Sequence, residues 1–205
     1  MGGRYSEIDY DTELYVNQSR VFTTVTNTAS AVHNWISDIY RIHRCRLNHL
    51  IVGLDAEWRP SSYGYSRGPV ATLQLCVGMR CLIFQLLHAD FIPGSLTIFL
   101  GNPNFTFVGV GVREDANKLQ NDYQLHVART LDLRPLAAEK LGMMEYKQAG
   151  LKRLADVVLG FDMDQSRNIT MSEWDAEMLD SDQVLYACMD AHVSFEIGKT
   201  LITSY

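Results

Sequence analysis

Residues 51–57 read Ile51-Val52-Gly53-Leu54-Asp55-Ala56-Glu57, an uncharged run that ends in two carboxylates. A short apolar run with β-branched residues is typical of a strand that is buried on both faces of a sheet. Residues 51–55 are therefore predicted to form a central strand. Because side chains alternate along a strand, Asp55 and Glu57 are predicted to point to the same side.

Other segments of the chain predict further strands and several helices. The predicted strands cover Val21–Thr26, Val70–Val77, Cys81–Leu86, Phe105–Val110 and Arg129–Asp132, with a hairpin turn at Gly78-Met79-Arg80. The predicted helices cover about Val32–Arg44, Ser95–Leu100, Glu114–Asn121, Leu151–Leu159 and a last helix after Asp180, and the loop from Arg59 to Gly68 is polar. Asp180 and Gln183 have the spacing of a capping box. Strands that are followed by helices indicate a mixed sheet covered by helices, an α/β three-layer domain.

The composition indicates one soluble globular domain over residues 1–205. Of the 205 residues, 47% are hydrophobic and 20% are charged, and no repeat or linker interrupts them. We expect no membrane association, because no run of about 18 apolar residues is present, and an intracellular location in the nucleus or cytoplasm, because no signal-peptide core is present. The four cysteines are predicted to be buried, reduced thiols. A net charge of −6 does not exclude nucleic acid, because a site that binds cations is itself acidic.

Asp115 follows a glycine-containing apolar segment, Phe107-Val108-Gly109-Val110-Gly111. This pattern predicts a strand that leads into a helix, with Asp115 near the carboxyl end of the strand, where open α/β sheets usually bind ligands. An acid that is only stabilised by the helix dipole is the simpler alternative.

Tyr186 and Asp190 are four residues apart in the last predicted helix, so they share a face of it. Their neighbours are mostly apolar, which predicts that this face meets the sheet. A buried acid needs a partner, and a cation is one candidate. A hydrogen bond between tyrosine and aspartate on a half-exposed face explains the pattern equally well.

The pair Asp55 and Glu57 alone is weak evidence, but the carboxylates and the tyrosine together, in this order, resemble the DEDDy group of 3′→5′ exonucleases, in particular the branch of the Werner syndrome exonuclease domain. The matching segments are Gly53–Trp58, Ala71–Cys76, Val108–Val112 with Asp115 and Lys118-Leu119, and Tyr186–Ala191, with further likeness at Leu151–Gly160 and Ser172–Trp174. The likeness covers the core, residues 50–203, whereas the strand and helix of residues 1–49 match less clearly. No helicase segment is present, so we expect a free-standing exonuclease domain.

The resemblance implies a ribonuclease H-like fold with a mixed five-stranded sheet and a site for two divalent ions, Mg²⁺ or Mn²⁺. It implies that Asp55 bridges both ions and that Glu57 and Asp190 hold the ion that activates water. Asp115 would help to hold the other ion through water, and Tyr186 would orient the attacking water. The implied reaction is hydrolysis of DNA or RNA from a free 3′ end, and a homo-oligomer is possible.

Some residues depart from the family pattern, and the roles of others stay open. Arg167 stands where a lysine is expected, and Glu114 places an extra acid beside Asp115. A catalytically weak scaffold that binds nucleic acid or assembles with itself is the alternative function. Trp58 could stack on a base or pack at the rim of the site, His192 is interpreted as a packing or surface residue, and the basic run Arg41-Ile42-His43-Arg44-Cys45-Arg46 is interpreted as the solvated end of a helix.

Overall fold

A seven-stranded mixed sheet forms the centre of the computed structural model, which describes residues 7–59, 68–164 and 167–203. The strands are β1 Asp9–Val16, β2 Ser19–Thr26, β3 Ile51–Trp58, β4 Val70–Val77, β5 Arg80–Phe84, β6 Thr106–Gly109 and β7 Thr130–Asp132. They lie in the order β1-β2-β5-β4-β3-β6-β7. Strands β3, β6 and β7 run parallel to one another, as do β2 and β5, and the other neighbours are antiparallel.

The expected five-stranded sheet is therefore corrected to seven strands among the described residues. Five of them, β5-β4-β3-β6-β7, come from the segments after residue 50, and the hairpin of β1 and β2 extends this sheet on the β5 side. Asn17 and Gln18 connect the hairpin with φ values of 44° and 65°, the left-handed conformation of a two-residue turn that matches strand twist.

The helices confirm most of the sequence prediction. They are α1 Ala29–Ile42, α2 Gly94–Leu100, α3 Val112–Tyr123, α4 Leu133–Leu141, α5 Leu151–Leu159, α6 Arg167–Thr170 and α7 Ser181–Thr203, with short 3₁₀ turns at Leu47–His49, Leu86–His88 and Met144–Gln148. The capping box at the start of α7 is present, because the Gln183 amide N–H donates to Asp180 Oδ1 and the Asp180 amide N–H donates to Gln183 Oε1. Helix α4 was not predicted, and the strand expected over Cys81–Leu86 ends at Phe84. Most of the predicted polar loop, residues 60–67, lies outside the described residues.

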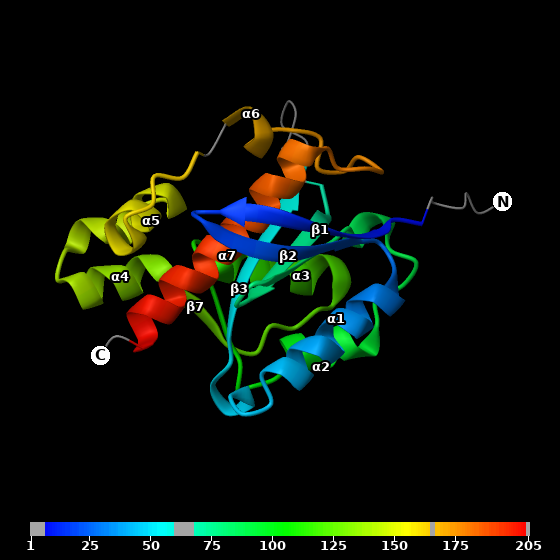
Figure 1. The fold of residues 1–205 in the computed structure, drawn as a ribbon, viewed down its shortest axis with the longest axis horizontal. Coiled ribbons are helices and arrows are strands. Elements are labelled where there is room, and N and C mark those ends of the chain that lie inside the picture. Colours follow the sequence, from blue (N-terminus) through cyan, green and yellow to red (C-terminus); the bar gives the residue numbers. More distant parts are fainter. Residues whose placement is uncertain (1–6, 60–67, 165–166, 204–205) are drawn as a thin grey trace.

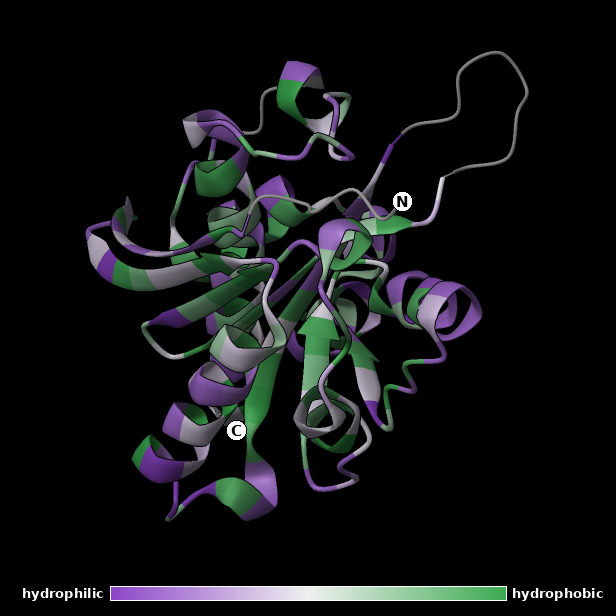
Figure 2. Ribbon diagram, turned by 90° about the vertical axis from the view of Figure 1, so that its right-hand side faces the viewer, coloured by the Kyte–Doolittle hydropathy of each residue, from purple (hydrophilic) through white to green (hydrophobic). Residues whose placement is uncertain are grey.

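Helices cover both faces of the sheet, as predicted for three layers. Helix α7 crosses one face in front of β3 and β4, with α4 and α5 beside it, and α1, α2 and α3 lie on the other face. Figure 2 shows the central strands as the most hydrophobic ribbons of the molecule. On the α1 and α2 side, Phe99 packs edge-on against Trp35 and Phe107 at centroid distances of 6.1 and 6.0 Å.

Glycines allow α7 to lie unusually close to the sheet. A Cβ atom at Gly53 in β3 would clash with the carbonyl oxygen of Ala191 and lie 2.8 Å from the amide nitrogen of Phe195. At Gly198, farther along α7, a Cβ atom would lie 2.7 Å from Val108 of β6. The backbone of α7 therefore touches the backbone of β3, and only glycine at position 53 permits that contact.

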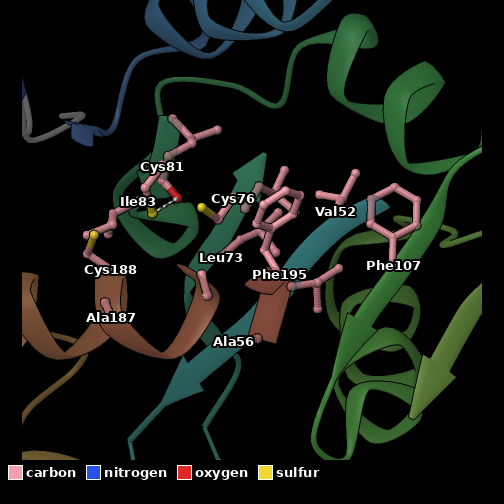
Figure 3. Packing of buried hydrophobic residues seen from close by; sticks show 14 of the residues in the cluster. Val52, Ala56, Leu73, Cys76, Cys81, Ile83, Phe107, Ala187, Cys188 and Phe195 are labelled. Atoms are coloured by element: carbon pink, nitrogen blue, oxygen red, sulfur yellow. Dashed lines mark hydrogen bonds between the residues drawn. The ribbon is translucent and has the colours of Figure 1, made fainter. Parts of the chain in front are cut away.

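Three of the four cysteines belong to the core. Figure 3 shows Cys188 of α7 facing Cys81 and Cys76 of the sheet, and Cys188 Sγ lies 3.2 Å from Thr23 Oγ1. All four are free thiols, but Cys45 is exposed, so the prediction of four buried thiols was wrong at that position. Cys45 lies in the turn after α1, where its side chain faces solvent. None of the described helices is long and apolar enough to cross a membrane.

We predict that Gly53→Ala destabilises the fold by about 3 kcal/mol or more, the upper end of overpacking effects, because a new methyl group must push α7 off β3. Gly94→Ala is the matched control, since a Cβ atom there meets nothing within 4 Å, and it should change stability by less than about 1 kcal/mol. Urea unfolding of both variants measures the difference. Equal stability of the two variants would show that α7 does not depend on the contact at Gly53.

Candidate active site

Three carboxylates meet where the end of β3 faces α7. One oxygen each of Asp55, Glu57 and Asp190 lies within 4.8 Å of the other two. Asp55 and Glu57 come from alternate positions of β3 and point to the same face, as the sequence predicts, and Asp190 reaches them because α7 lies directly on β3 at Gly53. The geometry fits the prediction that these three side chains can share one cation.

Asp115 lies beside this cluster without joining it. Strand β6 ends at Gly109, and Gly111 turns the chain into α3 with φ 78°, so that Asp115 falls in the first turn of the helix. Its side chain is 7% exposed, whereas the neighbouring Glu114 is exposed to solvent. The extra acid at Glu114 therefore points away from the cluster, and Asp115 is the residue that faces it.

Tyr186 lies one helical turn before Asp190 and is 6% exposed. Its hydroxyl forms a hydrogen bond of 3.0 Å with Thr170 Oγ1 at the end of α6, and its ring packs against Trp174 at a centroid distance of 5.9 Å. The Trp174 indole N–H donates in turn to the Thr170 carbonyl oxygen at 3.3 Å. Thr170 and Trp174 thus fix the direction of the phenol.

Burial and mutual repulsion raise the pKa values of the acids. Burial raises the pKa of Glu57, and the charges of Asp55, Asp190 and Asp115 raise it further. Burial likewise raises the pKa of Asp55, opposed by a hydrogen bond from the Ala56 backbone, and the pKa of Asp115, together with the charge of Asp55. Among the described residues, no lysine or arginine forms an ion pair with Asp55, Glu57 or Asp115. The charge of Arg134 lowers the pKa of Asp115 but does not cancel the increase, and a divalent cation would supply the remaining positive charge at these acids.

Two further polar residues stand beside the acids and were given no role by the sequence analysis. Gln74 and Thr72 of β4 pair directly with Asp55 and Glu57, so their side chains share the same face of the sheet. Gln74 Nε2 donates to Thr72 Oγ1 at 2.7 Å, and Gln74 Oε1 is buried without a hydrogen-bond partner. Both residues belong to the segment Ala71–Cys76 that carries part of the family resemblance. Their position opposite Asp55 and Glu57 depends on the register of β4 against β3, which the sequence alone does not give.

The side chains around the site clarify several open points. The Lys118 ammonium lies 5.4 Å from the ring centroid of Trp58 and 2.8 Å from Asp122, so Trp58 packs at the rim against α3. His192 is 3% exposed and its Nδ1 lies 3.2 Å from the Gly78 carbonyl oxygen, so the interpretation as a packing residue is confirmed. The side chain of Arg167 lies outside the described residues.

A pocket of about 510 Å³ opens next to Tyr186. Its lining combines apolar and acidic side chains, contributed by Asp164, Asn168, Ile169, Asp182, Leu185, Tyr186 and Met189. Tyr186 is the residue of the candidate site that lines this pocket.

Comparison with known proteins finds 3′-5′ exonucleases both among family models and among individual proteins. A family model described as 3′-5′ exonuclease matches residues 24–204. The chain is 38% identical over 152 residues to exonuclease 3′-5′ domain-containing protein 2 of Drosophila melanogaster, a match that covers 74% of this chain and 25% of that protein. It is 33% identical over 152 residues to the bifunctional 3′-5′ exonuclease/ATP-dependent helicase WRN of Mus musculus, covering 74% of this chain and 11% of that protein. The match thus involves one segment of each longer protein.

Among solved structures, Escherichia coli RNase D has the same fold. The two chains superpose with a TM-score of 0.71 at 20% sequence identity, over 87% of this chain and 44% of that one. The ribonuclease H-like architecture expected from the sequence is therefore confirmed.

We predict that the stability of the metal-free protein falls as pH rises above about 4, the usual pKa of a carboxyl group. A raised pKa means that the folded state holds its proton when the unfolded state has lost it, so each such carboxyl lowers the unfolding free energy by up to about 1.4 kcal/mol per pH unit. Glu57→Gln removes one such group and should be more stable than the original protein at pH 8 but not at pH 4.

Urea unfolding in EDTA at several pH values measures this difference, and Mn²⁺ should restore stability to the original protein more than to the variant. A difference between the two proteins that does not change with pH would contradict the electrostatic account of the cluster.

Proposed function

Because the chain belongs to the 3′-5′ exonuclease family, we propose that it hydrolyses phosphodiester bonds from the 3′ end of DNA or RNA with two divalent ions, Mg²⁺ or Mn²⁺. The observation that carries this proposal is the convergence of Asp55, Glu57 and Asp190 within 4.8 Å, without a compensating lysine or arginine at Asp55 or Glu57 among the described residues.

The carboxylates fit hard divalent cations, which prefer oxygen ligands. In this proposal Asp55, Glu57 and Asp190 hold one ion, and Asp55 also contributes to a second ion together with Asp115. Bound ions generate a nucleophile from water and stabilise charge on the scissile phosphate. Gln74 and Thr72 lie beside Asp55 and Glu57 and help to fix the carboxylates in one orientation.

Tyr186 acts in this proposal by position and not as a base. Burial and the charges of Asp190, Glu57 and Asp55 raise its pKa, while the hydrogen bond from Thr170 lowers it, so the phenol keeps its proton at neutral pH. A neutral phenol can orient a water molecule through a hydrogen bond. Thr170 holds the hydroxyl in place for that purpose.

The pocket beside Tyr186 is the proposed place for the 3′-terminal nucleotide. Ile169, Leu185 and Met189 offer apolar contacts to a base, and Tyr186, one helical turn before Asp190, lines the pocket on the side of the proposed cleavage site.

We predict that Asp55→Ala and Glu57→Ala abolish exonuclease activity and leave the fold intact. Asp115→Asn should also lower turnover by about 100-fold or more, since an electrostatic contact to the reacting groups is lost. Glu114→Gln is the matched control, because this exposed neighbour faces away and should keep turnover within about two-fold of the original. Single-turnover cleavage of a 3′-labelled oligonucleotide in Mn²⁺ measures the effect. If the unsubstituted protein shows no metal-dependent cleavage, the result would favour the alternative function of a non-catalytic scaffold.

We predict that Tyr186→Phe lowers turnover by about 10- to 1,000-fold, the loss expected for one hydrogen bond in the transition state, with little change in metal affinity or thermal stability. The variant keeps the ring that packs on Trp174. Thr170→Val should lower turnover in the same direction by a smaller factor, because the hydroxyl of Tyr186 loses its partner but remains present.

The measurements are single-turnover cleavage at saturating Mn²⁺ and a metal titration of each variant. Full turnover of Tyr186→Phe would assign the tyrosine to packing alone, and a large loss of metal binding would mean that α7 had been displaced.

A further inference from the structure

The end of the sheet opposite the carboxylate cluster carries positive charge. Three loops, residues 43–50, 101–105 and 126–129, lead into the parallel strands β3, β6 and β7 and therefore lie at the same end. Backbone hydrogen bonds join them: the Thr106 N–H donates to the Leu50 carbonyl oxygen at 2.8 Å, and the Ala128 N–H donates to the Leu100 carbonyl oxygen at 3.0 Å. Figure 1 shows the loop that enters β3 at the lower edge of the view, away from α6 and the start of α7.

These loops contain three arginines and three histidines but no aspartate or glutamate. Arg44, Arg46 and Arg129 are all exposed, and none of them forms an ion pair within the described part of the chain. Since two neighbouring strands are about 4.8 Å apart, the loops that enter β3 and β7 on either side of β6 are roughly 10 Å apart. We call this surface, made of residues 43–50, 101–105 and 126–129, the basic end.

More arginines continue the positive charge along the adjoining β-hairpins. Arg41 and Arg80 share one carboxylate, Asp38, at 2.8 and 3.7 Å. Arg80 pairs across the sheet with Phe22, and the guanidinium of Arg20 lies 4.9 Å from the centroid of the Phe22 ring. The turn before Arg80 is next to the basic end, because a Cβ atom at Gly78 would lie 3.9 Å from the ring of His43. Arg20 also forms an ion pair with Glu13 at 3.3 Å, so these arginines are partly neutralised and the unpaired positive charge is that of Arg44, Arg46 and Arg129.

Simple stabilisation of a helix end does not explain this distribution. A cation near the C-terminus of α1 interacts favourably with the helix dipole, and Arg41 or Arg44 can do so. Arg129 lies on a separate loop in front of β7, and Arg46 lies beyond the last turn of α1. In a chain with a net charge of −6, three exposed and unpaired arginines at one end form a local positive surface that can attract an anionic partner.

We propose that the basic end is a second nucleic-acid-binding surface, which holds the phosphate backbone of a substrate away from the cleavage site. Arginine favours a phosphate partner, because its planar guanidinium binds two phosphate oxygens at once. The identity of the polyanion rests on the proposed exonuclease function. An anionic lipid surface fits less well, because α1, the helix next to the arginines, carries Asp38 on its exposed side.

The position of this surface sets a length requirement for the substrate. Asp55 and Glu57 follow Ile51, the first residue of β3, by four and six positions, so the carboxylates lie roughly 13 to 20 Å from the basic end, about the length of four to six base pairs of duplex. A short oligonucleotide reaches only the cleavage site, whereas a longer one reaches both. The surface should therefore affect binding of long substrates only.

The test compares Arg44→Gln/Arg46→Gln/Arg129→Gln with a control that removes the same charge elsewhere, Lys147→Gln/Lys152→Gln/Arg153→Gln, whose three side chains are also exposed. Fluorescence anisotropy in EDTA measures binding of labelled single strands of about 30 and about 2 nucleotides at several salt concentrations. For the long strand, we expect the arginine variant to bind about 10-fold or more weakly, with a salt slope smaller by about two, because three phosphate contacts are lost. Binding of the short strand and the melting temperature should not change.

The outcomes separate this inference from the proposed function. Equal affinity and salt slope in the arginine variant and the control would overturn the second surface, whether or not the protein is a nuclease. Cleavage of the short strand in Mn²⁺ should be the same in both variants, and if no protein cleaves it, the exonuclease proposal fails while the binding result stands. Loss of binding to phosphatidylserine vesicles, with binding of the long strand retained, would assign the surface to lipid and overturn the inference.

Discussion

The contact between α7 and β3 at Gly53 brings Asp190 to the acids of β3, and the candidate site depends on it. Because position 53 has no side chain, the backbone of α7 rests on the strand, and Asp190 comes within 4.8 Å of Asp55 and Glu57. A helix separated from the sheet by side chains would be about 10 Å away, too far for an aspartate to share a ligand with the strand. Gly198 extends the same close contact to β6, where a Cβ atom would lie 2.7 Å from Val108.

This contact also holds together groups that repel one another. Burial and neighbouring charge raise the pKa values of Glu57, Asp55 and Asp115, so the acids destabilise the metal-free fold once they ionise. The apolar contacts between α7 and the sheet, which include Cys188 of α7 and Cys76 and Cys81 of the sheet, oppose that repulsion (Figure 3). A site held in this way is ready for cations before they bind, because the carboxylates need not be brought together by the ions themselves.

The parts of this arrangement that depend on short stretches of sequence were predicted, and the parts that depend on distant contacts were not. Two-residue alternation in β3 and four-residue spacing in α7 are local, so the shared face of Asp55 and Glu57 and that of Tyr186 and Asp190 followed from the sequence. Strand β1 was missed because its exposed positions alternate acids with tyrosine, and α4 because Pro135 stands in its first turn, where proline is tolerated. The roles of Gly53, Gln74 and Thr170 require the register of β4 or the placement of α6, which no local pattern specifies.

The direction of the strands then links the site to the rest of the surface. Parallel β3, β6 and β7 place Asp55, Glu57, Asp115 and Asp132 at their carboxyl ends, and the loops at their amino ends contain arginine and no acid. A cluster of carboxylates attracts cations but repels a phosphate backbone over roughly the Debye length of about 8 Å at physiological salt. The acids alone therefore cannot supply affinity for a nucleic acid. That affinity must come from bound ions, from the pocket beside Tyr186, and from positive charge far enough from the acids to escape their field, which is where the parallel strands place it.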